Sequence, residues 1–195
     1  AFITYIIMKS MVKGNTLAFL VDDDIMFAWT RAIHIYYYNE ETETVSKVQE
    51  ITAIENIWGT ALSESYFVYY TRDGSGKFDI FIYHREDPDD SFSLSWDQQL
   101  GPFNHEGGNI PMDLYEDILV IAPAGSNKVY IYKLQDGQFG PSLIVPMDWY
   151  WPSENFDIRI SGRNVVALDK VGEQISYFEI DDDRFTSCTP GILQD

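Results

Sequence analysis

One short apolar pattern recurs four times along the chain at nearly constant spacing. Its copies are residues 33–36, 80–83, 129–132 and 175–178, and their last residues lie 47, 49 and 46 positions apart. A fixed period of this length is typical of repeat proteins, in which each unit needs its neighbours to bury its apolar face. The sequence therefore predicts an array of about four similar units.

Three more strands are predicted in each unit around this pattern. An almost unbroken apolar run precedes it, which indicates a strand buried on both faces; the runs are residues 17–21, 66–70, 118–122 and 165–168. An earlier strand joins each run through a short polar turn; these strands are 6–11, 59–62, 110–115 and 156–160. A less apolar strand closes each unit; these strands are 45–51, 92–100, 139–145 and 185–192.

Each unit is thus predicted to be a four-stranded antiparallel meander, whose strands we name a, b, c and d in chain order. No helical periodicity is found, so the fold class is all-β. Meanders of about 47 residues favour a β-propeller over a solenoid, either as a four-bladed ring or as part of a larger ring. We expect a single propeller domain or segment over residues 1–195, with blades at 4–51, 57–100, 108–146 and 154–192.

Composition excludes several classes of protein. The 195-residue chain carries a formal net charge of −18, so its surface repels phosphate backbones and nucleic acid is not expected as a partner. Its single cysteine, Cys188, excludes an intrachain disulfide. The apolar run at 118–123 falls far short of the roughly 20 residues that span a bilayer, so no transmembrane segment is predicted. The chain starts at Ala1 without a signal peptide, and we expect a processed product or a segment of a longer protein.

The a and b strands resemble the FG-GAP repeat found in the propellers of integrin α-subunits. Trp58-Gly59 stands where that family has Phe-Gly, and residues 122–125 stand at its Gly-Ala-Pro position, ahead of the strand at 129–132. Two units depart from the pattern, because the one at Ile110 lacks Phe-Gly and the last one has Phe156-Asp157 instead. The resemblance implies a β-propeller and an extracellular or secretory location. Since the family's Asp-x-Asp-x-Asp-Gly loop is missing from the a–b turns, it implies no calcium site.

The connections between strands sort into two ends of each meander, because a–b and c–d turns share one end and b–c and d–a loops share the other. The c–d turns are acidic, with Glu40, Glu41, Glu43, Glu86, Asp87, Asp89, Asp90, Asp136, Asp181, Asp182 and Asp183. We interpret this acidic end as a solvated surface. Weak binding of divalent cations or docking of a basic partner are the alternatives.

The opposite end is mixed in charge, because basic side chains share it with Asp22, Asp23 and Asp24, and it also carries large aromatic side chains; we take it as the candidate binding rim. Its residues are Arg31, Trp58, Arg72, Phe103, His105, Trp149, Tyr150 and Trp151. Aromatic rings offer a large contact area at a small cost in rotamer entropy, which suits recognition of a protein or a sugar. The alternative is that these rings fill gaps between neighbouring sheets.

The leading functional hypothesis is a non-catalytic scaffold or recognition module that binds a protein partner through this rim, as part of a larger assembly. A carbohydrate-binding propeller of lectin type is the first alternative. A fragment of a glycosidase-like propeller is the second alternative.

No catalytic constellation is recognised, so neither enzymatic activity nor a cofactor or metal site is expected. Residues 71–78 are similar to the Asp box of sialidase propellers, but two defining positions differ and such a box is a structural turn. Residues 22–24 are three acids that could supply one glycosidase carboxylate, without an assignable second one. The remaining reactive side chains show no metal-site or nucleophile pattern; these are His34, His84, His105 and Cys188.

Overall fold

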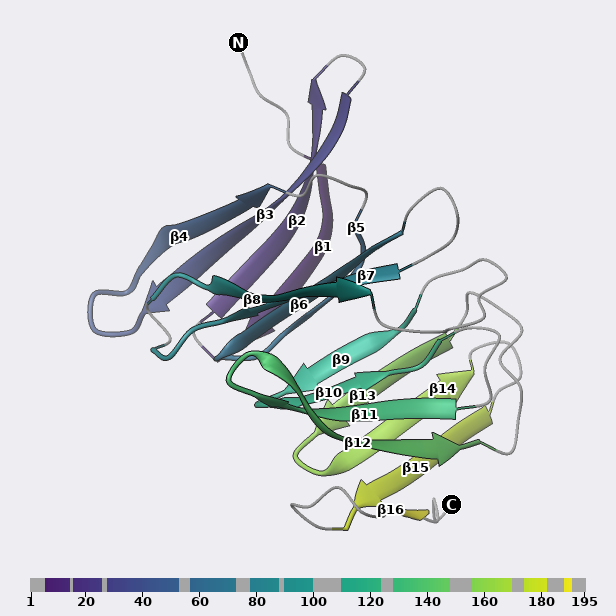
Figure 1. Ribbon diagram of the computed structural model, residues 1–195. Helices are drawn as coiled ribbons and strands as arrows, with labels where there is room; N and C mark the ends of the chain where they lie inside the picture. Colours follow the sequence, from purple (N-terminus) through teal and green to yellow (C-terminus); the bar gives the residue numbers. More distant parts are fainter. Residues whose placement is uncertain are drawn as a thin grey trace. The chain divides into compact units, whose positions relative to one another are not determined.

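The computed structural model describes residues 6–14, 16–25, 28–52, 57–72, 78–87, 90–99, 110–123, 128–147, 156–169, 174–181 and 188–190. These residues form sixteen strands in four antiparallel four-stranded sheets and contain no helix (Figure 1). Each sheet pairs its strands in chain order, as a meander. The chain divides into two compact units, residues 1–99 and 100–195, and each unit holds two sheets.

The first unit contains the first and second sheets. The first sheet consists of β1 (Ile6–Lys13), β2 (Thr16–Ile25), β3 (Ala28–Asn39) and β4 (Thr44–Thr52). The second sheet consists of β5 (Ile57–Leu62), β6 (Tyr66–Arg72), β7 (Phe78–His84) and β8 (Ser93–Gln99).

The second unit contains the third and fourth sheets. The third sheet consists of β9 (Met112–Tyr115), β10 (Ile118–Ile121), β11 (Lys128–Gln135) and β12 (Gln138–Pro146). The fourth sheet consists of β13 (Phe156–Ser161), β14 (Asn164–Asp169), β15 (Gln174–Ile180) and β16 (Cys188–Pro190).

Every predicted strand is present, and the main differences lie at strand ends. The predicted b–c loop of the first unit is too long, because residues 22–25 continue β2 and Arg31 lies inside β3. The antiparallel ladder runs on through the pairs Asp22↔Arg31 and Ile25↔Ala28, which satisfies backbone groups that a loop would leave to water. Trp58 was likewise expected in a d–a connection, but it lies in β5.

Within each unit, the two sheets pack with opposite faces in contact. We call the face that carries Ile33 and Ile35 of strand c the A face of the first sheet, and the face that carries His34 and Tyr36 its B face; the other sheets follow by repeat position. The A face of the first sheet packs on the B face of the second in one apolar cluster. Its A-face residues are Ala18, Ile33, Ile35 and Ile51, and its B-face residues are Phe67, Tyr69 and Phe92 with Phe81 and Tyr83 at its edge.

The third and fourth sheets follow the same rule. The A-face residues Val120, Val129 and Ile131 pack against Val165 and Phe178 on the B face of the fourth sheet. Phe178 stands at the repeat position of Tyr36, and Val165 at that of Leu17. This packing of an A face on a B face buries Phe67 of the second sheet and Val120 of the third. Val68 and Leu119, on the other faces of the same strands, are also fully buried.

Gly59 allows a close approach within the second sheet. It pairs with Tyr70, and a Cβ atom at Gly59 would lie 2.2 Å from Cε1 of the fully buried Tyr70 ring. The Trp58-Gly59 pair of the FG-GAP resemblance therefore has a local packing reason for its glycine.

We predict that Val120→Asp unfolds the protein. Val120 on β10 is fully buried against the fourth sheet. The carboxylate of an aspartate there would lose its water without gaining a partner, at a cost of about 3–5 kcal/mol. Urea unfolding followed by far-UV circular dichroism measures this loss. The matched control is Ile144→Asp, because Ile144 is 52% exposed on β12 and should change the free energy of unfolding by less than about 0.5 kcal/mol.

Candidate functional site

Arg85 organises the acidic end of the first unit. This arginine is almost completely buried at the start of the c–d turn of the second sheet. Its Nε donates to the Glu64 carbonyl oxygen at 2.7 Å, its Nη1 to the Asp90 carbonyl oxygen at 3.3 Å, and its Nη2 to the Thr16 hydroxyl. The guanidinium carbon lies 4.2 Å from the centre of the Phe92 ring. One side chain thus ties three turns together, two from the second sheet and one from the first.

Gly14 lets the first sheet approach the turn that holds Arg85 closely. Gly14 adopts a positive φ of 53° in the a–b turn, and a Cβ atom there would lie 2.1 Å from Oε1 of Glu64. Gln49 of β4 adds a second polar joint, since its amide exchanges two hydrogen bonds of 2.8 and 2.7 Å with the backbone of Phe92. The turn ends of both sheets therefore lie together.

Acidic side chains of the described c–d turns point to solvent, as expected. Those that the structure describes as exposed are Glu40, Glu41, Glu43, Glu86, Asp87, Asp90, Asp136 and Asp181. The predicted members Asp89, Asp182 and Asp183 lie outside the described residues. Among the described residues, no group of three His, Cys, Asp or Glu side chains is arranged to hold a metal ion.

The same backbone bond supports the turn end in three sheets. The amide after strand c, or at its end, donates to a carbonyl of the a–b turn: Arg85 to Ser65 at 3.0 Å, Leu134 to Asp117 at 2.7 Å and Ile180 to Arg163 at 2.9 Å. In the third sheet the Lys133 ammonium also lies 3.6 Å from the Asp117 carboxylate. In these three sheets the bonds therefore fix the backbone conformation at the start of the c–d turn.

The predicted binding rim is described only in part. Arg31 pairs with Asp22 near the b–c end of the first sheet, and Arg72 ends β6 opposite Phe78. Trp58 occupies the register shift between Ile57 and Gly59, beside the end of β6. Since the turn ends of both sheets meet at Arg85, these three backbone positions share the opposite end of the first unit. Their side chains are not described, and five members lie outside the described residues: Phe103, His105, Trp149, Tyr150 and Trp151.

A polar group lies on the B face of the first sheet, where sequence patterns gave no signal. His34 is almost buried and its Nε2 lies 3.3 Å from Oε2 of Glu50, which also accepts a 2.5 Å hydrogen bond from Lys47. That hydrogen bond, with the positive charges of Lys47 and His34, lowers the pKa of Glu50 despite the opposing effect of burial. A carboxylate whose pKa is lower in the folded state stabilises the fold at neutral pH, and this contribution is lost as the pH falls through its folded pKa.

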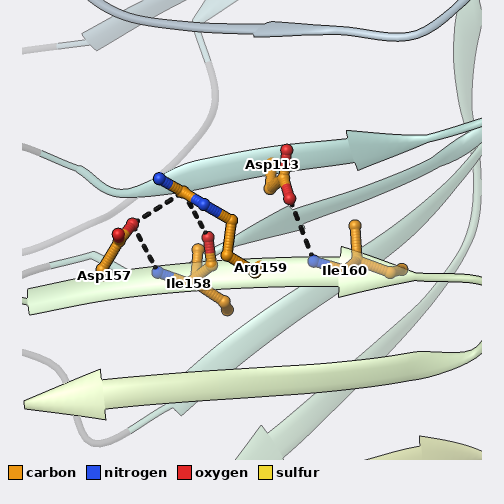
Figure 2. A network of polar contacts seen from close by, with 5 residues as sticks. All are labelled: Asp113, Asp157, Ile158, Arg159 and Ile160. Carbon is orange, nitrogen blue, oxygen red and sulfur yellow. Dashed lines mark hydrogen bonds and ion pairs between the residues drawn. The ribbon is translucent and has the colours of Figure 1, made fainter. Parts of the chain in front are cut away.

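A second network connects β9 and β13, the a strands of the third and fourth sheets (Figure 2). Oδ2 of Asp113 on β9 accepts a 3.0 Å hydrogen bond from the Ile160 amide on β13, so this carboxylate joins two sheets. On β13, Arg159 donates to Oδ1 of Asp157 at 2.7 Å and to the Ile158 carbonyl oxygen at 2.8 Å (Figure 2). The Arg159 side chain is largely exposed, so this ion pair contributes little to stability.

The other reactive side chains form no site among the described residues. His34 belongs to the polar group with Glu50, and the His84 ring contacts the Tyr66 ring at a tilt of 35°, with ring centres 4.7 Å apart. Burial, and next the nearby Tyr130, raise the pKa of Tyr132 to about 12, so this phenol is not poised to transfer a proton at neutral pH. Cys188 begins β16. No helix long enough to cross a membrane occurs among the described residues.

No protein family and no curated protein matches the sequence. Solved structures do match. The chain resembles KlAtg21, solved in complex with the coiled coil of AgAtg16, at 12% identity and a TM-score of 0.53, over 95% of this chain and 69% of that one. It also resembles the β-propeller domain of the trilobed protease from Pyrococcus furiosus at 11% identity and a TM-score of 0.54, over 96% and 57%.

A third similar structure is Hsv2 from Kluyveromyces lactis, with 13% identity and a TM-score of 0.50, over 97% of this chain and 64% of that one. These likenesses show the fold: the four sheets are blades of the β-propeller type. The chain spans between about half and two thirds of the length of these three structures.

We predict that Arg85→Met destabilises the protein by about 3 kcal/mol. Methionine keeps the packing against Phe92 but leaves the part-buried carbonyls of Glu64 and Asp90 and the buried Thr16 hydroxyl without their donor. Urea unfolding measures the loss, and Arg159→Met, the same change at an exposed arginine, serves as the control. Equal stability of the two variants would contradict the role assigned to Arg85.

Proposed function

We propose that the chain is a non-catalytic β-propeller recognition module that binds a protein partner through the rim defined by Arg31, Trp58, Arg72, Phe103, His105, Trp149, Tyr150 and Trp151. The observation that carries the proposal is the placement of the three described members, Arg31, Trp58 and Arg72, at one end of the first unit. Tryptophan and arginine are the residues that most often dominate the energy of protein interfaces.

The two ends of the first unit differ in chemistry, which supports a single binding end. The turn end carries exposed carboxylates around the buried Arg85, and carboxylates are depleted at interface centres. The predicted rim at the loop end combines aromatic and guanidinium residues with the aspartates at 22–24, and aromatic rings bury a large area at a small entropic cost. KlAtg21, which shares the fold, was solved with a coiled-coil partner, so a propeller of this kind can serve as a protein-binding platform.

A finer family assignment is part of the same proposal. Membership of the FG-GAP repeats is supported by the Trp58-Gly59 pair, in which the Tyr70 ring occupies the space of a Cβ atom. An extracellular or secretory location follows from that assignment.

We predict that Trp149→Ala and Arg72→Ala each weaken binding of the protein partner at least about tenfold without changing the melting temperature of the module. The partner is obtained by affinity capture on the 195-residue chain, purified, and titrated against each variant by isothermal calorimetry. Arg159→Ala is the matched control, because Arg159 is exposed on β13 and is not one of the rim residues.

The same variants separate the proposal from its alternatives. Unchanged affinity in both rim variants would refute the rim. Binding on a glycan array that disappears with Trp149→Ala, with no protein captured, would instead establish the lectin-type alternative.

A further inference from the structure

Two buried threonines lie on the face of the second sheet that packs against the first sheet. Thr60 of β5 is 1% exposed and Thr71 of β6 is 2% exposed. Thr60 pairs with Tyr69, which belongs to the apolar cluster between the two sheets, and Thr71 lies two residues further along β6. Because side chains two residues apart in a strand share a face, both threonines lie on the B face, toward the loop end of the sheet.

The Thr71 hydroxyl requires a hydrogen-bond partner. Its Oγ1 atom is shielded from solvent, and it has no hydrogen bond to any of the described residues. A buried hydroxyl without a partner destabilises a fold, so buried polar groups in native proteins are paired with protein atoms or with ordered water. The partner of Thr71 must therefore be a group that fits inside the interface.

Asp79 of β7 lies directly opposite Thr71 and on the same face of the sheet. Its side chain is half-buried. The Cβ atoms of such a cross-strand pair are about 4.5–5.5 Å apart. One water molecule that forms hydrogen bonds of about 2.8 Å to both side chains spans a gap of this size.

The strand on the other side of Thr71 is irregular at the same level. The pairing of β5 with β6 shifts register between Ile57 and Gly59, so Trp58 is an extra residue opposite the end of β6. A bulge of this kind leaves its extra residue out of the ladder and bends the strand locally. Thr60 follows directly after the bulge, so polar groups of three neighbouring strands surround one place in the interface.

We propose that one ordered water molecule is bound at this place, between the Thr71 hydroxyl and the Asp79 carboxylate, with the Thr60 hydroxyl as its third partner. Water suits these groups because a carboxylate only accepts hydrogen bonds, whereas a threonine hydroxyl both donates and accepts them. Buried waters typically make about three hydrogen bonds. The inference does not depend on the proposed function, although Trp58 of the rim stands in the adjacent bulge.

Urea unfolding of Thr71→Val tests the site. Valine has nearly the same shape but no hydroxyl, so the water loses a hydrogen bond and the unfolding equilibrium constant should rise about tenfold. The matched control is Thr52→Val, on the exposed end of β4, which should change that constant by less than about threefold. If the Thr71 hydroxyl had no partner in the folded protein, valine would instead remove a desolvated group. An equilibrium constant that is unchanged or lower overturns the proposal.

A crystal structure of the 195-residue chain locates the water directly. The expected result is a water within hydrogen-bond distance of both Thr71 Oγ1 and the Asp79 carboxylate, which is missing from the Thr71→Val variant. A direct hydrogen bond between these two side chains, with no water at this place, overturns the proposal.

A change of salt distinguishes the water from a bound cation, because carboxylate and hydroxyl oxygens also suit a small hard cation such as sodium. Stability in sodium chloride and in tetramethylammonium chloride of equal ionic strength should be the same. A loss of stability without sodium that is seen in the parent protein and is absent from Thr71→Val would assign the place to a cation and overturn the proposal.

Discussion

Face-to-face burial of apolar sheets is the interaction on which the rest of the structure depends. A four-stranded meander has two faces, and its inner strands in this chain are apolar on both, so no sheet could bury its own side chains. Strands β6 and β10 show the result, because Phe67 and Val120 are fully buried against the neighbouring sheet of their own unit. The turns, the polar joints and the two ends of each blade are consequences of holding sheets in this stacked arrangement.

Hydrogen bonds from polar side chains fix the position of one sheet relative to the next, which apolar contact alone does not. Apolar contact is proportional to buried area, and it would tolerate sliding of one sheet over the next. Three side chains hydrogen-bond a neighbouring sheet: Arg85 through the Thr16 hydroxyl, Gln49 through the backbone of Phe92, and Asp113 through the Ile160 amide. The outer strands β4, β8 and β12 each contain a register shift of the β-bulge kind. A bulge twists an edge strand and discourages pairing with another chain.

The strands could be predicted from the sequence because their apolar runs repeat at a regular period, as with residues 118–121 and 165–168. The ends of strands were harder to predict, as residues 22–31 show. Their acidic side chains suggested a loop, but the hydrogen-bonded pairing of β2 with β3 continues past them. Arg85 gave no signal, because a lone arginine beside acidic residues looks like a solvated turn, and only the tertiary structure buries it. The rim at Trp149–Trp151 remains a prediction, since those residues lie outside the described part of the chain.

Native-state amide hydrogen exchange, read residue by residue by NMR, tests most directly whether stacked inner strands hold this protein together. Hydrogen-bonded amides of β6 and β10 should exchange only through global unfolding, while those of β4 and β12, at the edges of their sheets, should open at lower free energy. If the amides of β4 and β12 proved as slow to exchange as those of β6 and β10, or slower, stability would not reside in the stacked inner strands and the account would be contradicted.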